Sequence, residues 1–353
     1  MRILTVVGAR PQFIKAAAVS RELRKKPEVE EILIHTGQHF DAGMSDIFFE
    51  QMEIPRPDHR LQISGMNHGA MTGRMLEGVE ALITDRKPDW VLIYGDTNST
   101  LAGALAAAKL HVPVAHVEAG LRSFNMRMPE EINRVLADRI SSVLFCPTAH
   151  AVSNLEAEGY RNLNVEIQLV GDVMQDAALF YKSRARRPES VSTYARDDLI
   201  LATVHRAENT DDRERLTQIV MALNRLHRDQ PVVLPLHPRT RKCLEKYGLK
   251  LDLHVIEPVG YLEMVWLLEH AQIVLTDSGG LQKEAYFFGR PCVTLRDETE
   301  WVELVERGVN YLSGANAESI LSAVGRMRPV TVMDDDQLYG GGQAARRIAQ
   351  YFV

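Results

Sequence analysis

The sequence has few cysteines, no long apolar run and no excess of positive charge, and each absence removes a class of function. Its 353 residues include only Cys146, Cys243 and Cys292, so neither a disulfide framework nor a cysteine metal site is expected. The apolar stretch at the amino terminus is too short for a signal peptide and is interrupted by Arg10 and Pro11. The formal net charge of -6 disfavours a nucleic-acid surface. We therefore expect a cytoplasmic protein without membrane insertion or nucleic-acid binding.

The length and the order of apolar segments predict two domains. A chain of 353 residues exceeds what one core usually supports. Buried-type strands and helical segments alternate from residues 3–9 onward, and the alternation starts again at 198–205, which is typical of doubly wound parallel sheets. We predict an α/β fold of two Rossmann-like domains facing a cleft, at 1–168 and 169–335. A helix at 336–353 is expected to pack back on the first domain.

Acidic side chains follow two strands of the first domain and begin a helix. Asp96 ends the apolar segment DWVLIYGD, and Glu118 follows VPVAHV, so both are expected at the carboxyl edge of the sheet, where α/β proteins bind ligands. Glu130 and Glu131 come directly after Pro129. Both can be explained as acids at a positive helix end, an alternative that stays open for Glu131 and fits Glu130 less well. Because Glu118 and Glu130 bracket one short loop, they could converge on one pocket.

A glycine turn and two cations near the amino terminus predict an anion site. Gly8, Ala9 and Arg10 precede a helix whose amino terminus would attract an anion, and Lys15 adds a second charge. The spacing G-x-G-x-x-G is absent, so this is not a dinucleotide fingerprint. An ordinary turn between strand and helix remains the alternative.

The second domain carries two histidines at strand ends. His205 ends LILATVH with Arg206 beside it, and His237 ends PVVLPLH. A lone histidine is more often packed in a core, but the strand-end position and the adjacent Arg206 favour function. We add Tyr261 to the candidate binding residues.

The segment TDSGGLQKEA is the sharpest signal of the second domain. Ser278, Gly279 and Gly280 would expose backbone donors at the start of a helix, which suits phosphate oxygens. Glu284 lies one turn further and would bind a pair of ribose hydroxyls. The alternative is a plain glycine turn with Glu284 facing its own helix.

Six segments in order, GARPQFIK, GDTNST, HVEAGLRS, MPEEINR, HRAEN and TDSGGLQKEA, resemble the non-hydrolysing UDP-N-acetylglucosamine 2-epimerase family across nearly the whole chain. The resemblance implies a glycosyltransferase-B-like fold with UDP held by the second domain. It implies an isomerase that converts UDP-N-acetylglucosamine to UDP-N-acetylmannosamine by elimination and re-addition of UDP, for bacterial surface polysaccharides. No metal or other cofactor is expected, and the partners expected are the UDP-sugar and a second copy in a homodimer.

The resemblance also assigns residues. The catalytic residues it implies are Asp96, Glu118, Glu130 and His205. The UDP-sugar-binding residues expected are Arg10, Lys15, Arg122, Arg206, His237, Tyr261, Ser278, Gly279, Gly280 and Glu284. Which carboxylate serves which face of C2 stays open.

Two departures from the common family pattern bear on the substrate. The stretch TGQHFDAGMSD at 36–46 differs from the AQHR-type form of many family members, which puts an allosteric UDP-sugar site in doubt. The SFNMRMPEE loop is shorter than the family form that contains YSPWPEE. Both resemble the branch of UDP-2,3-diacetamido-2,3-dideoxy-glucuronate 2-epimerases. Arg122 and Arg127 would face a sugar carboxylate, or pair with local acids. UDP-N-acetylglucosamine is the first expectation and the diacetamido uronate the alternative. A glycosyltransferase of the same fold, a hydrolysing epimerase and a nucleotide-sugar sensor are more distant alternatives.

Overall fold

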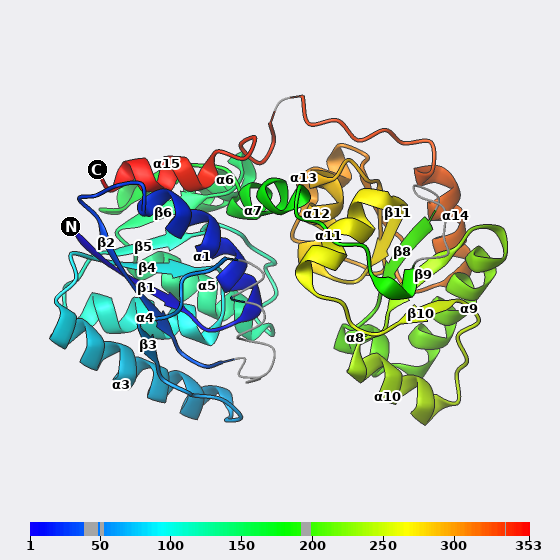
Figure 1. Cartoon of the computed structure of the whole chain (residues 1–353), viewed down its shortest axis with the longest axis horizontal. Helices are drawn as coiled ribbons and strands as arrows, with labels where there is room; N and C mark the ends of the chain where they lie inside the picture. Colours follow the sequence, from blue (N-terminus) through cyan, green and yellow to red (C-terminus); the bar gives the residue numbers. More distant parts are fainter. Residues whose placement is uncertain (39–48, 50–52, 192–198, 336) are drawn as a thin grey trace. The chain divides into compact units, whose positions relative to one another are not determined.

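The computed structural model describes residues 1–38, 49, 53–191, 199–335 and 337–353. The chain forms two compact α/β units (Figure 1). The first unit comprises Met1–Ala177 and Asp336–Val353, and the second unit comprises Ala178–Asp335. In the described parts of the chain, no helix is both long and apolar enough to cross a membrane.

The first unit is built on a seven-stranded parallel sheet of order β3-β2-β1-β4-β5-β6-β7. Its strands are β1 (Arg2–Val7), β2 (Glu30–His35), β3 (His59–Arg60), β4 (Trp90–Tyr94), β5 (Val114–Val117), β6 (Val143–Cys146) and β7 (Glu166–Leu169). The central strands are buried along almost their whole length, as expected for a parallel sheet covered on both faces. The strand order reverses between β1 and β4, which is where open α/β sheets bind ligands.

Helices of the first unit follow the strands in the predicted alternation. They are α1 (Arg10–Leu23), α3 (His68–Arg86), α4 (Asn98–Lys109), α5 (Pro129–Ile140) and α6 (Ala149–Ala157), with a 3₁₀ turn at Tyr160–Asn162. The next helix, α7 (Val173–Lys182), begins in the first unit and ends in the second. The alanine-rich α4 lies close to the sheet: a Cβ on Gly103 would come within 3.0 Å of Ile93 Cγ2. The small side chains of α4, the helix that follows the loop after β4, thus allow it to pack directly on the strands.

The last helix, α15 (Ala344–Tyr351), belongs to the first unit. Phe352 packs edge-on against Trp90 with ring centroids 5.6 Å apart, and Tyr351 packs against Phe145 at 5.3 Å. The sequence placed a boundary at 168–169, but this point falls within β7, which pairs with β6. The chain instead passes to the second unit after Ala177.

The second unit has a six-stranded parallel sheet of order β10-β9-β8-β11-β12-β13. Its strands are β8 (Leu199–Thr203), β9 (Val232–Pro235), β10 (His254–Ile256), β11 (Ala271–Thr276), β12 (Cys292–Thr294) and β13 (Asn310–Leu312). Its helices are α8 (Ala207–Thr210), α9 (Arg213–Asp229), α10 (Pro238–Tyr247), α11 (Tyr261–His270), α12 (Gly279–Phe287), α13 (Val302–Glu306) and α14 (Ala317–Met327), with a 3₁₀ turn at Glu189–Val191. The order reverses between β8 and β11. Two doubly wound sheets therefore confirm the predicted α/β class.

Candidate functional site

Glu118 occupies a strained position at the end of β5. Its φ is 69°, in the left-handed region that costs a non-glycine residue about 1–3 kcal/mol. The carboxylate forms an ion pair with Lys15 of α1, and the side chains of the two residues are only 9% and 11% exposed. The pair lies against Gly95, where a Cβ would be 3.2 Å from Lys15 Nζ and 3.3 Å from Glu118 Oε2. Lys15 of the helix after β1 therefore meets residues of the loops after β4 and β5 at the carboxyl edge of the sheet.

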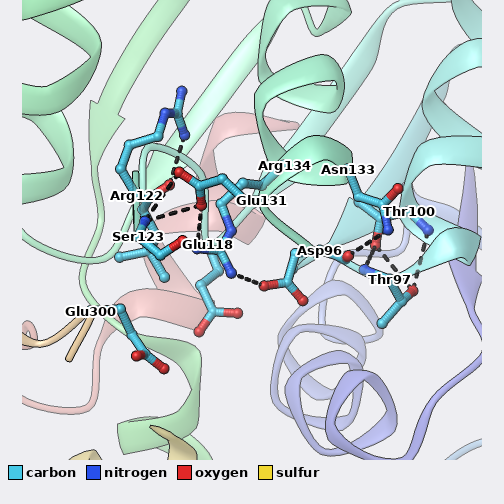
Figure 2. Close-up of polar contacts among 12 residues, drawn as sticks. Asp96, Thr97, Thr100, Glu118, Arg122, Ser123, Glu131, Asn133, Arg134 and Glu300 are labelled. Carbon is cyan, nitrogen blue, oxygen red and sulfur yellow. Dashed lines mark hydrogen bonds and ion pairs between the residues drawn. The ribbon is translucent and has the colours of Figure 1, made fainter. Parts of the chain in front are cut away.

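Asp96 is fixed by two residues of α5 (Figure 2). Arg134 pairs with the Asp96 carboxylate through Nη2, and its Nη1 lies 2.9 Å from Oε2 of Glu131. Asn133 Nδ2 donates to the Asp96 carbonyl oxygen at 2.9 Å. The helix that follows Glu118 in sequence therefore orients the acid that ends the neighbouring strand.

Glu130 and Glu131 are neighbours with opposite environments. Glu131 is 1% exposed, and its carboxylate accepts from the backbone N–H of Ser123 at 3.0 Å and of Phe124 at 2.9 Å, as Figure 2 shows for Ser123. Glu130 is exposed on the first turn of α5. Glu131 therefore anchors the loop between β5 and α5, whereas the Glu130 side chain is open to solvent.

Arg122 lies in a buried ion network of the first unit. Its guanidinium donates to Glu158 Oε1 at 2.7 Å and Oε2 at 2.9 Å, and to Asp138 Oδ2 at 2.7 Å. Burial lowers the pKa of Arg122, but the two carboxylates outweigh it and raise the pKa overall. Asp138 also accepts from or pairs with His116 Nδ1 at 2.7 Å. Pairing with local acids was the alternative to substrate binding for Arg122. The structure supports that alternative, because Asp138 and Glu158 bind the guanidinium.

The turn after β1 is closed by a side chain of the protein itself. The backbone N–H groups of Gly8 and Ala9 donate to Gln12 Oε1 at 2.8 and 3.0 Å. Gln12 Nε2 in turn donates to the Tyr94 carbonyl oxygen at 2.7 Å. These two amides are therefore engaged and do not form the anion cradle that the sequence suggested. Arg10, the first residue of α1, remains at this edge.

In the second unit, His205 and Asp277 come together from adjacent strand ends. Asp277, fully buried after β11, accepts from the backbone N–H of His205 at 3.0 Å and of Arg206 at 3.0 Å. His205 Nδ1 lies 3.3 Å from Asp277 Oδ1. His237 is the N-cap of α10, and its ring centroid is 5.7 Å from that of His205. Sequence reasoning missed Asp277, although it lies within the TDSGG segment.

The glycine segment begins α12 as predicted. Ser278 is the N-cap, with its Oγ 3.5 Å from the backbone N of Leu281. The Glu300 carboxylate lies against Gly279, since a Cβ there would be 2.0 Å from Glu300 Oε1. Burial raises the pKa of Glu300, but Arg296, at 3.0 Å, and Arg206 lower it overall. Glu300, which the sequence did not single out, therefore supplies a negative charge beside the predicted phosphate cradle.

The last two candidates of the second unit are buried to a similar degree. Glu284 is 8% exposed on α12. Tyr261 is 7% exposed at the start of α11, and its ring packs edge-on against Tyr181 at 5.6 Å.

Among the described residues, no group of three or more histidine, cysteine or acidic side chains is arranged to hold a metal ion. Of the stretch 36–46, residues 39–46 lie outside the described residues, so the interpretation of an altered second site stays a prediction.

Comparison with known proteins gives a consistent result. A family model described as UDP-N-acetylglucosamine 2-epimerase matches residues 21–353. The UDP-2,3-diacetamido-2,3-dideoxy-D-glucuronate 2-epimerase of Pseudomonas aeruginosa is 61% identical over 100% of this chain and 99% of its own length. A UDP-N-acetylglucosamine 2-epimerase homolog of Methanococcus maripaludis is 50% identical over 99% of each chain. The crystal structure of Methanocaldococcus jannaschii UDP-GlcNAc 2-epimerase with UDP-GlcNAc and UDP superposes with a TM-score of 0.89 at 42% identity, covering 100% of this chain and 99% of the other.

Proposed function

The chain belongs to the UDP-N-acetylglucosamine 2-epimerase family, and on that premise we propose that this isomerase inverts C2 of a UDP-activated 2-acetamido sugar without hydrolysing it. The observation that carries the proposal is the pair of acidic side chains at the carboxyl edge of the first sheet. There, Glu118 and Asp96 lie at the ends of neighbouring strands, each paired with a cation.

Two substrates are considered. The 61% identity to a UDP-2,3-diacetamido-2,3-dideoxy-D-glucuronate 2-epimerase favours the diacetamido uronate. The likeness to a structure solved with UDP-GlcNAc, at 42% identity, supports UDP-N-acetylglucosamine as the second candidate. Both substrates carry an acetamido group at C2 and UDP at C1, so the same chemistry applies to both.

The reaction requires UDP to leave because C2 has no neighbouring carbonyl that would stabilise a carbanion. When the C1–O bond breaks, its electron pair goes to UDP and positive charge develops at C1. The C2 proton then becomes acidic enough for transfer to a carboxylate, which leaves a glycal. Return of a proton to the opposite face of C2 and attack of UDP on C1 complete the inversion. Acid–base groups on the two faces are therefore the main catalytic need.

We assign the sugar chemistry to residues of the first unit. Glu118 and Glu130 exchange the C2 proton, and Asp96 stabilises the positive charge that develops at C1. Lys15 acts mainly as the partner of Glu118, and Arg134 pairs with the Asp96 carboxylate and orients it. Arg122 is not included, because its guanidinium is held by Asp138 and Glu158.

We assign nucleotide binding to residues of the second unit. The backbone N–H groups at Gly279 and Gly280 and the positive end of α12 suit the phosphates, with the side chains of Arg206 and His205 at the diphosphate. Glu284 binds the ribose hydroxyls, and His237 and Tyr261 complete the set. Cationic side chains and helix ends suffice for the phosphate charge, so the reaction needs no metal or other cofactor.

We further propose that the enzyme acts in the cytoplasm as a homodimer, supplying precursors of surface polysaccharides. The reduced cysteines are compatible with a cytoplasmic site, since Cys146 and Cys292 are buried and none of the three is in a disulfide. Light scattering of the purified protein tests the dimer, and a mass of one 39.7 kDa chain would contradict it.

Proton NMR in heavy water tests the reaction, with each candidate substrate in a separate sample. We expect deuterium at C2 of both epimers, appearance of the manno-configured UDP-sugar and no free sugar. Release of free sugar would indicate a hydrolysing enzyme. Absence of exchange with either substrate, despite tight UDP binding, would overturn the epimerase proposal and direct the search to sugar acceptors of a transferase.

A further inference from the structure

The turn that carries His205 and Arg206 is held by one buried carboxylate. Asp277 is fully buried at the carboxyl end of β11. It accepts from two consecutive backbone N–H groups, those of His205 and Arg206, and from Asn209 Nδ2 at 3.2 Å. Because β8 and β11 are paired at the point where the strand order reverses, the end of one strand fixes the loop that follows the other.

The same carboxylate faces the imidazole ring. His205 Nδ1 is 3.3 Å from Asp277 Oδ1, and the His205 side chain is 38% exposed while that of Asp277 is fully buried. The ring therefore turns its Nδ1 side to the protein interior. The other charged or titratable groups that act on the ring are His237, 5.7 Å away between ring centroids, and Arg206.

We propose that Asp277 is a positioning residue of the reaction, which fixes the turn of His205 and Arg206 and holds the Nδ1 proton of His205. When the ring takes up a second proton, the imidazolium carries that proton on Nε2, facing the departing diphosphate. The last step of this inference depends on the proposed function, but the orientation and tautomer of His205 do not.

The electrostatic surroundings of His205 give Asp277 a specific role. Burial lowers the pKa of His205, Asp277 raises it, and His237 and Arg206 lower it further, so that the pKa lies below its ordinary value and Asp277 offsets part of the effect of burial. Asp277 is thus the described group that favours the imidazolium, in the way that a buried aspartate supports a catalytic histidine in hydrolase triads. An imidazolium donates a hydrogen bond to phosphate, which neutral imidazole with a free Nε2 lone pair does not.

The test uses the full-length protein with ¹⁵N-labelled histidine and does not require turnover. In the wild type we expect neutral His205, assigned by comparison with a His205→Gln sample, to carry its proton on Nδ1. In Asp277→Asn the pKa of His205 should fall by about one unit or more. Asn209→Ala is the matched control: it removes one contact to Asp277 but keeps the charge, so its His205 pKa should stay at the wild-type value.

Enzyme kinetics add a second readout. Deprotonation of His205 should limit kcat on the alkaline side, and Asp277→Asn should move that limb to lower pH, whereas Asn209→Ala should leave it in place. A wild-type His205 with its proton on Nε2 would overturn the proposal even if Asp277→Asn failed to fold. An unchanged His205 pKa in folded Asp277→Asn would overturn it too. Absence of epimerisation in the wild type would contradict the proposed function but leave the NMR result decisive for Asp277.

Discussion

The ammonium group of Lys15 forms an ion pair with the carboxylate of Glu118, across 103 positions of the sequence. The two side chains are almost buried, where an unpaired charge would be costly. The sequence suggested Lys15 as a phosphate ligand beside the glycine turn. The contact instead indicates that Lys15 compensates the charge of Glu118, the carboxylate that we propose as a catalytic group.

Replacing Lys15 with methionine separates these roles. We expect kcat to fall on the order of 10²-fold, because Glu118 loses the cation that pairs with its carboxylate and positions it, while the Kd for UDP changes by less than about threefold. Calorimetry measures the UDP affinity, and the C2 exchange assay measures turnover. Lys15→Met combined with Glu118→Gln should be no worse than the more severe single variant, since the two act as a unit. A large loss of UDP affinity would restore the phosphate role.

Glu130 and Glu131 provide a matched pair of substitutions. Glu130→Gln should nearly abolish turnover and leave the free energy of unfolding within about 0.5 kcal/mol of wild type, since the side chain is exposed. Glu131→Gln should lower the free energy of unfolding by about 1–3 kcal/mol, because the buried carboxylate loses its charge-assisted bonds to the loop. Urea denaturation and the exchange assay distinguish the two. Equal stability of both variants would contradict the anchoring role of Glu131.

The positions of the strand-end acids could be predicted because buried parallel strands are continuous apolar runs and their ends are visible in the sequence. Asp96, Glu118 and His205 all follow such runs, and the structure places each at the carboxyl edge of its sheet. The alternation of strands and helices fixes the order of elements by the same logic.

The hydrogen-bond and ion-pair partners of the polar groups could not be predicted, because most come from distant elements and none is marked by a pattern in the sequence. Arg122 reaches Asp138 and Glu158, which lie 16 and 36 positions away. Gln12 satisfies the glycine turn from within α1, where a glutamine is an ordinary helix former. Asp277 was visible within TDSGG, but its role follows only from the backbone of a neighbouring strand end.

The two arginines of the loop between β5 and α5 have different expected roles: Arg122 in stability and Arg127 in the choice of substrate. Arg122→Met should lower the free energy of unfolding by about 3–5 kcal/mol, because the buried carboxylate of Asp138 loses its guanidinium partner and the partly exposed Glu158 loses its ion pair. Arg127 is exposed, so Arg127→Met should leave stability unchanged. If Arg127 contacts a sugar carboxylate, this variant should raise KM for the diacetamido uronate but not for UDP-N-acetylglucosamine. Equal KM effects on the two substrates would exclude that contact.

The two glycines of the α12 segment differ in the space around them. A Cβ on Gly279 would lie 2.0 Å from Glu300 Oε1, whereas nothing lies within 4 Å of one on Gly280. Gly279→Ala should therefore destabilise the protein by about 1–3 kcal/mol, since Glu300 is also held by Arg296. Gly280→Ala should be neutral or stabilise it by up to about 1 kcal/mol, as alanine favours a helix. Thermal unfolding measures both, and a destabilised Gly280→Ala with an unaffected Gly279→Ala would contradict the placement of Glu300.

His35 makes the stability of the first unit depend on pH. It is 1% exposed, accepts from the Gly37 backbone N–H at 2.9 Å and packs edge-on against Phe13 at 4.8 Å. Burial, with a smaller effect of Arg60, lowers the pKa of His35 to about 4, whereas the unfolded chain has a histidine pKa of about 6.5. Between these values only the unfolded state takes up the proton. The contribution of His35 is therefore present above about pH 6.5 and is lost as the pH falls towards 4.

Urea denaturation at several pH values measures this loss. His35→Asn keeps an acceptor for the Gly37 N–H but removes the titration. Between pH 6.5 and 4 the free energy of unfolding of the wild type should fall more steeply than that of the variant, by up to about 1.4 kcal/mol per pH unit. His254, which is only partly buried, offers a control: His254→Asn should keep most of the wild-type slope. Parallel curves for wild type and His35→Asn would mean that His35 is protonated in the folded protein, and that its burial against Phe13 does not exclude the charge.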